Sequence, residues 1–137
     1  MFEMLALTTL LLQAFGSTAH GIPPQLERPP YEGQWVVEII DRIEVMPDSQ
    51  VTMRIEGQTI TGLASCNTYR GRFTVTGTSV QVGELLKTMK ACDTARLSEE
   101  EDFLSLLRDV VHYEVQSRDS LALETSDGKT IVAKRER

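Results

Sequence analysis

The chain alternates apolar and polar residues in short runs separated by glycine turns, a pattern that favours antiparallel β-structure. Val51, Met53 and Ile55 alternate with polar neighbours, and Glu56-Gly57 supplies a turn before the chain returns through residues 59–62. Successive side chains of a strand point to opposite faces, so this alternation predicts a strand with one buried face. A hairpin follows.

The same signal occurs twice more along the chain. Residues 69–75 and 79–82 flank Gly77, and residues 120–124 and 130–133 flank Asp127-Gly128. Residues 35–40 are rich in β-branched side chains and predict a first strand. Short connections make neighbouring strands antiparallel, and we expect the last hairpin to close the fold.

One segment has helical spacing instead. Ser98 followed by Glu101 is a capping box, and it predicts a helix over about residues 98–111. Its apolar stripe is Phe103, Leu106, Leu107, Val110 and Val111. We interpret Glu99, Glu100 and Asp102 as a solvated helix start, because consecutive carboxylates point in different directions and do not converge on one cation. The expected class is mainly β (α+β).

Composition limits the class of protein. The chain has 137 residues, of which 41% are hydrophobic and 25% are charged, which is typical of one soluble domain. Its formal charge of -6 repels phosphate backbones, so we expect no nucleic-acid partner.

The N-terminal region resembles a secretory leader. An apolar run over residues 4–15 is too short for a stable membrane span, and small residues precede a predicted cleavage after Ala19. This divides the chain into a signal peptide (1–19), a proline-rich linker (20–32) and a domain (33–137). A buried N-terminal helix is the alternative for the run, and a proline-rich ligand is the alternative for the linker.

Cys66 and Cys92 are the only cysteines. In an exported protein an even cysteine count predicts a disulfide. The alternative, if the chain is not exported, is a pair of buried thiols.

The sequence offers little for catalysis. Cys66 with His112 as its base is a weak thiol-enzyme candidate, because His112 falls at the predicted helix end, where a cation suits the dipole. Two cysteines and His112 do not have zinc-site spacing, and no glycine-rich phosphate loop occurs. We expect no metal, no cofactor and no enzymatic activity.

Residues 33 to 133 resemble the META/HslJ family of small exported domains. The shared landmarks in chain order are Gly33, Trp35, Gly62, Cys66, Asn67, Tyr69, Gly71, Thr88, Ala91, Cys92, Glu100, Phe103 and Leu107. Ser65 stands where the family usually places a glycine. The resemblance implies a curved antiparallel sheet or partly open β-barrel with a helix across it. It also implies a link to stress tolerance and envelope function, without a defined reaction.

Most of these landmarks have a structural interpretation. Asn67 suits a left-handed turn and caps amides, while Gly62 and Gly71 permit close backbone approach. Trp35 and Tyr69 suit a core that touches water at its edge, and Thr88 belongs to the motif before Cys92. The alternative is an aromatic-lined groove at the barrel mouth.

We therefore expect a non-enzymatic periplasmic or secreted domain that binds a protein or peptide partner. The alternative is a carrier of a small apolar ligand inside the half-open barrel. The sequence leaves the partner and the oligomeric state open.

Overall fold

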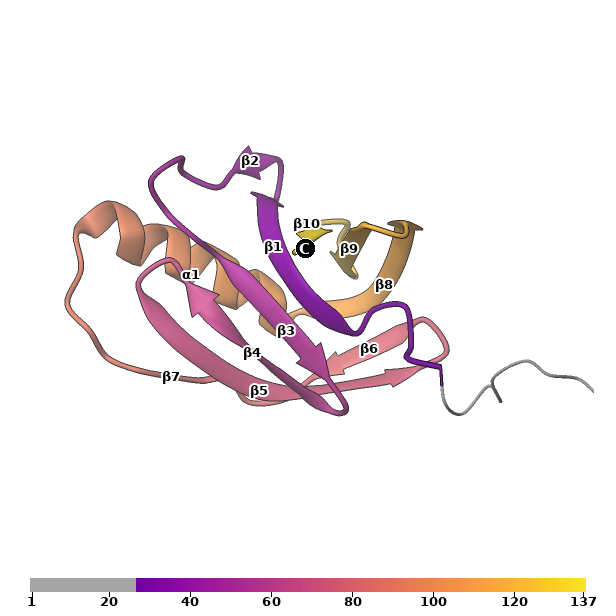
Figure 1. Ribbon diagram of the computed structural model, residues 1–137. Helices are drawn as coiled ribbons and strands as arrows, with labels where there is room; N and C mark the ends of the chain where they lie inside the picture. Colours follow the sequence, from indigo (N-terminus) through magenta and orange to yellow (C-terminus); the bar gives the residue numbers. More distant parts are fainter. Residues whose placement is uncertain (1–26) are drawn as a thin grey trace, which may run out of the picture.

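The computed structural model describes residues 27–137, which form strands and one α-helix (Figure 1). The predicted signal peptide and most of the predicted linker lie outside the described residues. The elements in chain order are β1 (Gly33–Ile40), β2 (Ile43–Glu44), β3 (Thr52–Glu56), β4 (Thr59–Ala64), β5 (Asn67–Thr76), β6 (Ser79–Val82), β7 (Leu86–Lys87), α1 (Thr94–Arg108), β8 (Val110–Ser117), β9 (Ser120–Thr125) and β10 (Thr130–Arg135).

The strands form a closed antiparallel barrel of eight strands, with β2 and β7 outside the ring. The order around the ring is β1-β3-β4-β5-β6-β8-β9-β10, and β10 returns to β1 with Trp35 opposite Arg135. The predicted mainly β class with one helix is confirmed, and so are the three hairpins. Closure goes further than the partly open barrel that the family resemblance implied. The thinnest seam is β6–β8, where Ser79 opposite His112 is the paired position.

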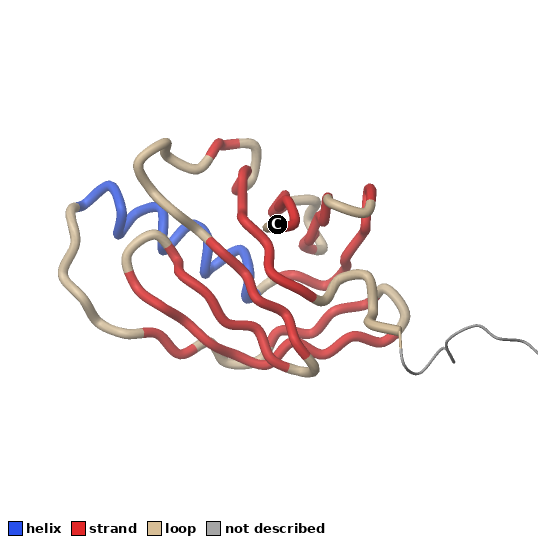
Figure 2. Tube along the Cα trace, viewed as in Figure 1, coloured by secondary structure: helices blue, strands red, loops and turns tan. Residues whose placement is uncertain are grey.

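The strand alternation places one face of each strand inside the ring. Trp35, Met53, Phe73, Phe103 and Leu107 are each at most 1% exposed and belong to one apolar cluster. Helix α1 lies across the barrel, seen in blue in Figure 2, and adds Phe103, Leu104, Leu106 and Leu107 to the cluster. The interior is therefore occupied by the protein's own side chains.

The predicted helix start was wrong. Asp93 caps α1, with its carboxylate accepting the Arg96 amide at 2.9 Å, and Ser98 lies inside the helix. An aspartate before a helix-compatible run is as good a cap as serine, and this one also pairs with the Arg96 guanidinium at 2.7 Å. The helix therefore begins after Asp93, and the Ser98–Glu101 capping box does not form its start.

The predicted helix end was also wrong. The helix stops at Arg108, and Val110 and Val111 begin β8. His112 accordingly lies in a strand and not at a helix terminus. The β-branched pair favours the strand, since β8 gains a full partner in β9.

The end of the predicted linker segment contacts the barrel. The Tyr31 ring lies 5.0 Å from that of Tyr113 and 6.1 Å from that of Phe73. The Trp35 indole N–H donates to the Tyr31 carbonyl at 2.9 Å. Residues 31 and 32 therefore pack with the domain.

Candidate functional site

Cys66 and Cys92 form a disulfide with their Cα atoms 6.1 Å apart. The bond joins the β4–β5 turn to the segment between β7 and α1. It therefore holds an exposed connection against the barrel.

The turn before the disulfide keeps a left-handed backbone without glycine. Ser65 has φ +72°. Its amide donates to the Gln50 carbonyl at 3.0 Å, and its hydroxyl lies 2.8 Å from that of Ser49. These bonds hold the conformation that a glycine adopts without strain.

Asn67 links two segments that are far apart in the sequence. Its side-chain oxygen accepts from the Lys90 amide at 2.6 Å and from the Thr88 hydroxyl at 2.9 Å. Amide capping by this side chain was expected, but the left-handed residue of the turn is Ser65, because Asn67 already belongs to β5. Asn67 and Thr88 thus fasten the disulfide-bonded segment from inside.

Glu100 contradicts the prediction of a wholly solvated acidic cluster. Its side chain is 1% exposed and accepts from the Asn67 backbone amide at 2.7 Å, the Asn67 side-chain amide at 3.1 Å and the Lys87 ammonium at 2.6 Å. Burial acts to raise the pKa of Glu100, but these hydrogen bonds outweigh it and hold the pKa below its usual value. Glu100 is one of the family landmarks, but our interpretation of the sequence makes it part of a solvated helix start and so does not predict a buried ion pair.

Four further landmark residues, Gly62, Gly71, Trp35 and Tyr69, lie in closely packed positions. A Cβ on Gly62 would lie 2.1 Å from the Thr52 carbonyl oxygen, and one on Gly71 would lie 2.5 Å from the Leu85 side chain. Trp35 is fully buried, and Tyr69 is 4% exposed with its hydroxyl donating to the Thr52 carbonyl at 2.8 Å. Burial raises the pKa of Tyr69 well above its ordinary value. Trp35 lies wholly in the core, whereas Tyr69 also borders a hollow beside Leu86 and Lys87.

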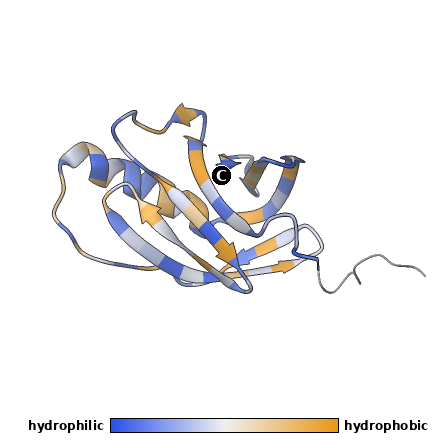
Figure 3. Cartoon of the chain, viewed as in Figure 1, coloured by the Kyte–Doolittle hydropathy of each residue, from blue (hydrophilic) through white to orange (hydrophobic). Residues whose placement is uncertain are grey.

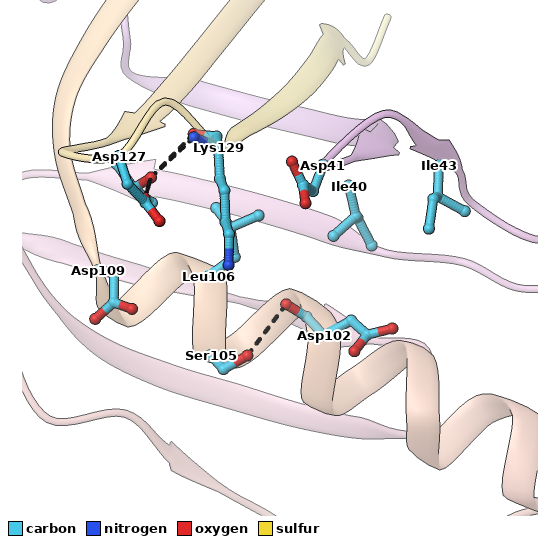
Figure 4. A pocket seen from close by; sticks show the side chains of 10 residues that line it. Ile40, Asp41, Ile43, Asp102, Ser105, Leu106, Asp109, Asp127 and Lys129 are labelled. Carbon is cyan, nitrogen blue, oxygen red and sulfur yellow. Dashed lines mark hydrogen bonds between the residues drawn. The ribbon is translucent and has the colours of Figure 1, made fainter.

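A different surface is hollowed. Two adjoining cavities of about 250 and 280 Å³ lie between the β1–β2 arm and α1, and Ile40, Ile43 and Asp102 line both. The first extends to the β9–β10 turn, and the second extends along α1 to Ala95. We call this continuous feature the β2–α1 groove; Figure 4 shows its first part.

The lip of the groove follows from a tight turn. Asp41 and Arg42 have φ of +46° and +73°, the positive values of a two-residue hairpin turn that returns β2 along β1. Ile43 stands on this lip and is 69% exposed; Figure 3 shows the orange of an apolar residue at β2. An apolar side chain is thus presented to solvent beside a cavity.

The groove is anchored at the start of α1. The Glu99 carboxylate accepts from the Met46 amide at 2.9 Å and from the Ser49 hydroxyl. The Arg96 guanidinium donates to the Asp48 carbonyl at 2.7 Å. These bonds hold the β2–β3 loop against the helix, so Glu99 is not simply solvated either.

The arrangement of the chain is shared with other proteins. A family model described as the META domain matches residues 25–137. The chain belongs to the META domain family. A comparison with curated protein sequences finds no significant match.

Solved structures resemble this META domain in fold. An NMR structure of a protein from Burkholderia xenovorans has a TM-score of 0.64 and 18% identity, covering 92% of this chain and 99% of the other. A crystal structure of a DUF4847 family protein from Bacteroides vulgatus has a TM-score of 0.56 and 17% identity, covering 77% of this chain and 93% of the other. At these identities the likeness concerns the fold alone.

Two further findings apply to residues 27–137 of the META domain. No helix there has the length and apolarity of a membrane span. No group of three or more His, Cys, Asp or Glu side chains there is arranged to hold a metal ion.

Sequence reasoning did not find the β2–α1 groove. Its lining comes from the β1–β2 arm, α1 and the β9–β10 turn, which are distant in the chain. A signal was present in Ile43, an isolated apolar residue after the turn residues Asp41-Arg42, but its exposure depends on the tertiary structure.

Proposed function

We propose that this META domain is a non-enzymatic exported domain that binds a segment of a partner protein in the β2–α1 groove. The observation that carries the proposal is the continuous groove, with the exposed Ile43 on its lip. Concave sites with an apolar floor and polar rim are the usual place where proteins hold a peptide segment.

The dimensions of the groove suit a peptide. Its lining residues on this side run from Ala95, in the first turn of α1, to Asp109, the residue that follows the helix, which corresponds to roughly 20 Å at 1.5 Å per residue. An extended segment of about six residues has that length. Ile40 and Leu106, each 6% exposed, supply apolar surface at the bottom.

Other observations support the remaining parts of the proposal. Cys66 and Cys92 are joined in the disulfide, so Cys66 has no free thiol to act as a nucleophile. A disulfide also suits an oxidising compartment. The barrel interior is filled by core side chains, so the external groove offers more space to a ligand than the interior does.

Site-specific photo-crosslinking in native cells tests the binding site. A photoreactive amino acid at Ala95, in the groove wall, is expected to give an adduct with a defined partner that the Ile43→Ser substitution removes. Ile43 is exposed, so this substitution leaves the fold intact. The same photoreactive group at Thr76, on β5 and away from the groove, is the control. Equal adducts at both positions, or adducts indifferent to Ile43→Ser, would contradict the proposal.

Export is tested independently. Mass spectrometry of the protein recovered outside the cytosol is expected to give a chain that begins at residue 20. A full-length chain confined to the cytosol would contradict export.

A further inference from the structure

We infer that the β2–α1 groove selects a cationic segment, in which lysine or arginine side chains are interspersed with apolar ones. The inference rests on the proposed function and specifies the chemistry of the partner. It comes from the distribution of charge around the groove.

Carboxylates line the groove on every side. Asp41 belongs to the β1–β2 turn, Asp102 and Asp109 to the helix side, and Asp127 to the β9–β10 turn (Figure 4). Glu44 and Glu99 continue the series in the second cavity. Because they come from separate elements, these acidic side chains would face a bound segment from both sides of the groove.

Several of these carboxylates have no cationic partner among the described residues. Across residues 27–137, the salt bridges use other acidic residues, and Asp41, Asp102 and Asp109 take part in none. Their negative charge is therefore available to a ligand. A cation that enters the groove exchanges part of its water for these largely exposed carboxylates, and several of them together attract it more strongly than one would.

Lys129 lies where a ligand's cation would lie. Its side chain crosses from the β9–β10 turn toward Ser105 and Leu106, with the ammonium between the turn and the helix (Figure 4). Among residues 27–137 it forms no salt bridge. A ligand ammonium would be attracted by the same carboxylates as the Lys129 ammonium, and the two positive charges would repel each other.

The apolar part of the segment follows from the floor and lip. Ile40 and Leu106 lie at the bottom, Ile43 stands on the lip, and Met46 lines the far end. A purely charged ligand would leave these surfaces uncovered. A segment that alternates cationic and apolar side chains satisfies both.

Three synthetic octapeptides test the inference by fluorescence anisotropy with the full chain. One combines four lysines with four leucines, and the others replace the lysines by glutamine or by glutamate. The lysine peptide is expected to bind at least about tenfold more tightly than the glutamine peptide at low salt, and the glutamate peptide most weakly. About 0.5 M salt should greatly reduce this preference, because exposed charges are then screened.

Substitutions locate the effect. Asp102→Asn with Asp109→Asn is expected to weaken the lysine peptide about fivefold, consistent with two exposed ion pairs. Lys129→Met is expected to strengthen binding about threefold. Glu84→Gln with Glu114→Gln, which removes two exposed carboxylates away from the groove, is the matched control and should change affinity little.

The outcomes separate the two proposals. Equal binding of the lysine and glutamine peptides, lost with Ile43→Ser, would overturn the cationic preference and leave the groove as a binding site. If the groove pair of substitutions and the control pair weaken binding of the lysine peptide equally, the preference reflects only the net charge of the protein. That result would also overturn the inference. If no peptide binds, the inference fails, and if Ala95 also gives no specific adduct, the proposed function fails with it.

Discussion

Glu100 is a fully buried carboxylate whose charge is compensated by one ammonium and two amide donors. Removing one partner of a buried ion pair leaves the other without compensation, and this costs more than the pair contributes. Lys87 is 31% exposed, whereas Glu100 is 1% exposed, so the two partners are not equivalent. An unpaired Glu100 carboxylate would therefore cost more free energy than an unpaired Lys87 ammonium, which can reach solvent.

We therefore predict that Lys87→Met destabilises the domain more than Glu100→Gln does. The first change leaves a buried charge and should lower the free energy of unfolding by about 3 kcal/mol. The second leaves Lys87 free to reach solvent and should lower it by about 1 kcal/mol. Urea unfolding at neutral pH measures both, and the reverse order would contradict the assignment.

The same pair predicts a pH dependence. Because the folded-state pKa of Glu100 is lowered, its contribution to stability is complete above the unfolded pKa of about 4.3 and is lost as pH falls through the folded value. The stability difference between the native chain and Glu100→Gln should therefore shrink between pH 6 and strongly acidic pH. A constant difference would show that Glu100 titrates alike in both states.

At the scale of the element, α1 has two competing caps in sequence and one in structure. Asp93 accepts the Arg96 amide, while Ser98 is an exposed residue of the second turn. The preceding disulfide residue Cys92 fixes where the chain enters the helix. The cap and the covalent bond thus act on adjacent residues.

Asp93→Ala is expected to lower the free energy of unfolding by about 1 kcal/mol, the usual value for loss of an N-cap. Ser98→Ala is the matched control and should change stability by only a few tenths of a kcal/mol, since alanine favours a helix interior. Thermal and urea unfolding compare the two variants. A larger effect at Ser98 would restore the capping box that the sequence suggested.

For the whole molecule, Arg135 joins the two ends of the described chain where the barrel closes. Its guanidinium lies 4.3 Å from the centre of the Trp35 ring and donates to the Glu32 carbonyl at 2.9 Å and the Pro30 carbonyl at 3.0 Å. Gly33 has φ +134°, and a Cβ there would lie 2.5 Å from the guanidinium. Glycine therefore makes room for this contact.

Arg135→Met is expected to lower the free energy of unfolding by about 2 kcal/mol, because the cation–π contact and several charge-assisted hydrogen bonds are lost together. Hydrogen exchange should also become faster at the amides of β1 and β10. Arg137→Met is the control: its side chain is 80% exposed, and its surface pair with Asp119 should contribute little. Equal effects of the two substitutions would contradict a closing role for Arg135.

Local patterns predicted much of the fold, for physical reasons visible at particular residues. The alternation at Val51, Met53 and Ile55 and the turn at Gly57 depend on neighbours in the chain, and both appear in the structure. Strand β8 was missed because Val110 and Val111 also fit a helical stripe. Their pairing with β9 depends on residues outside any local window.

The amino-acid sequence by itself determined the hairpins, the presence of one helix and the family, because these follow from short-range periodicity and from motifs at regular spacing. Only the tertiary structure decided that Glu100 is buried, that Asp93 caps α1, and that Ile43 stands over a groove edged by carboxylates. Burial and local potential depend on which distant segments fold against a residue. Barrel closure sets those neighbours here.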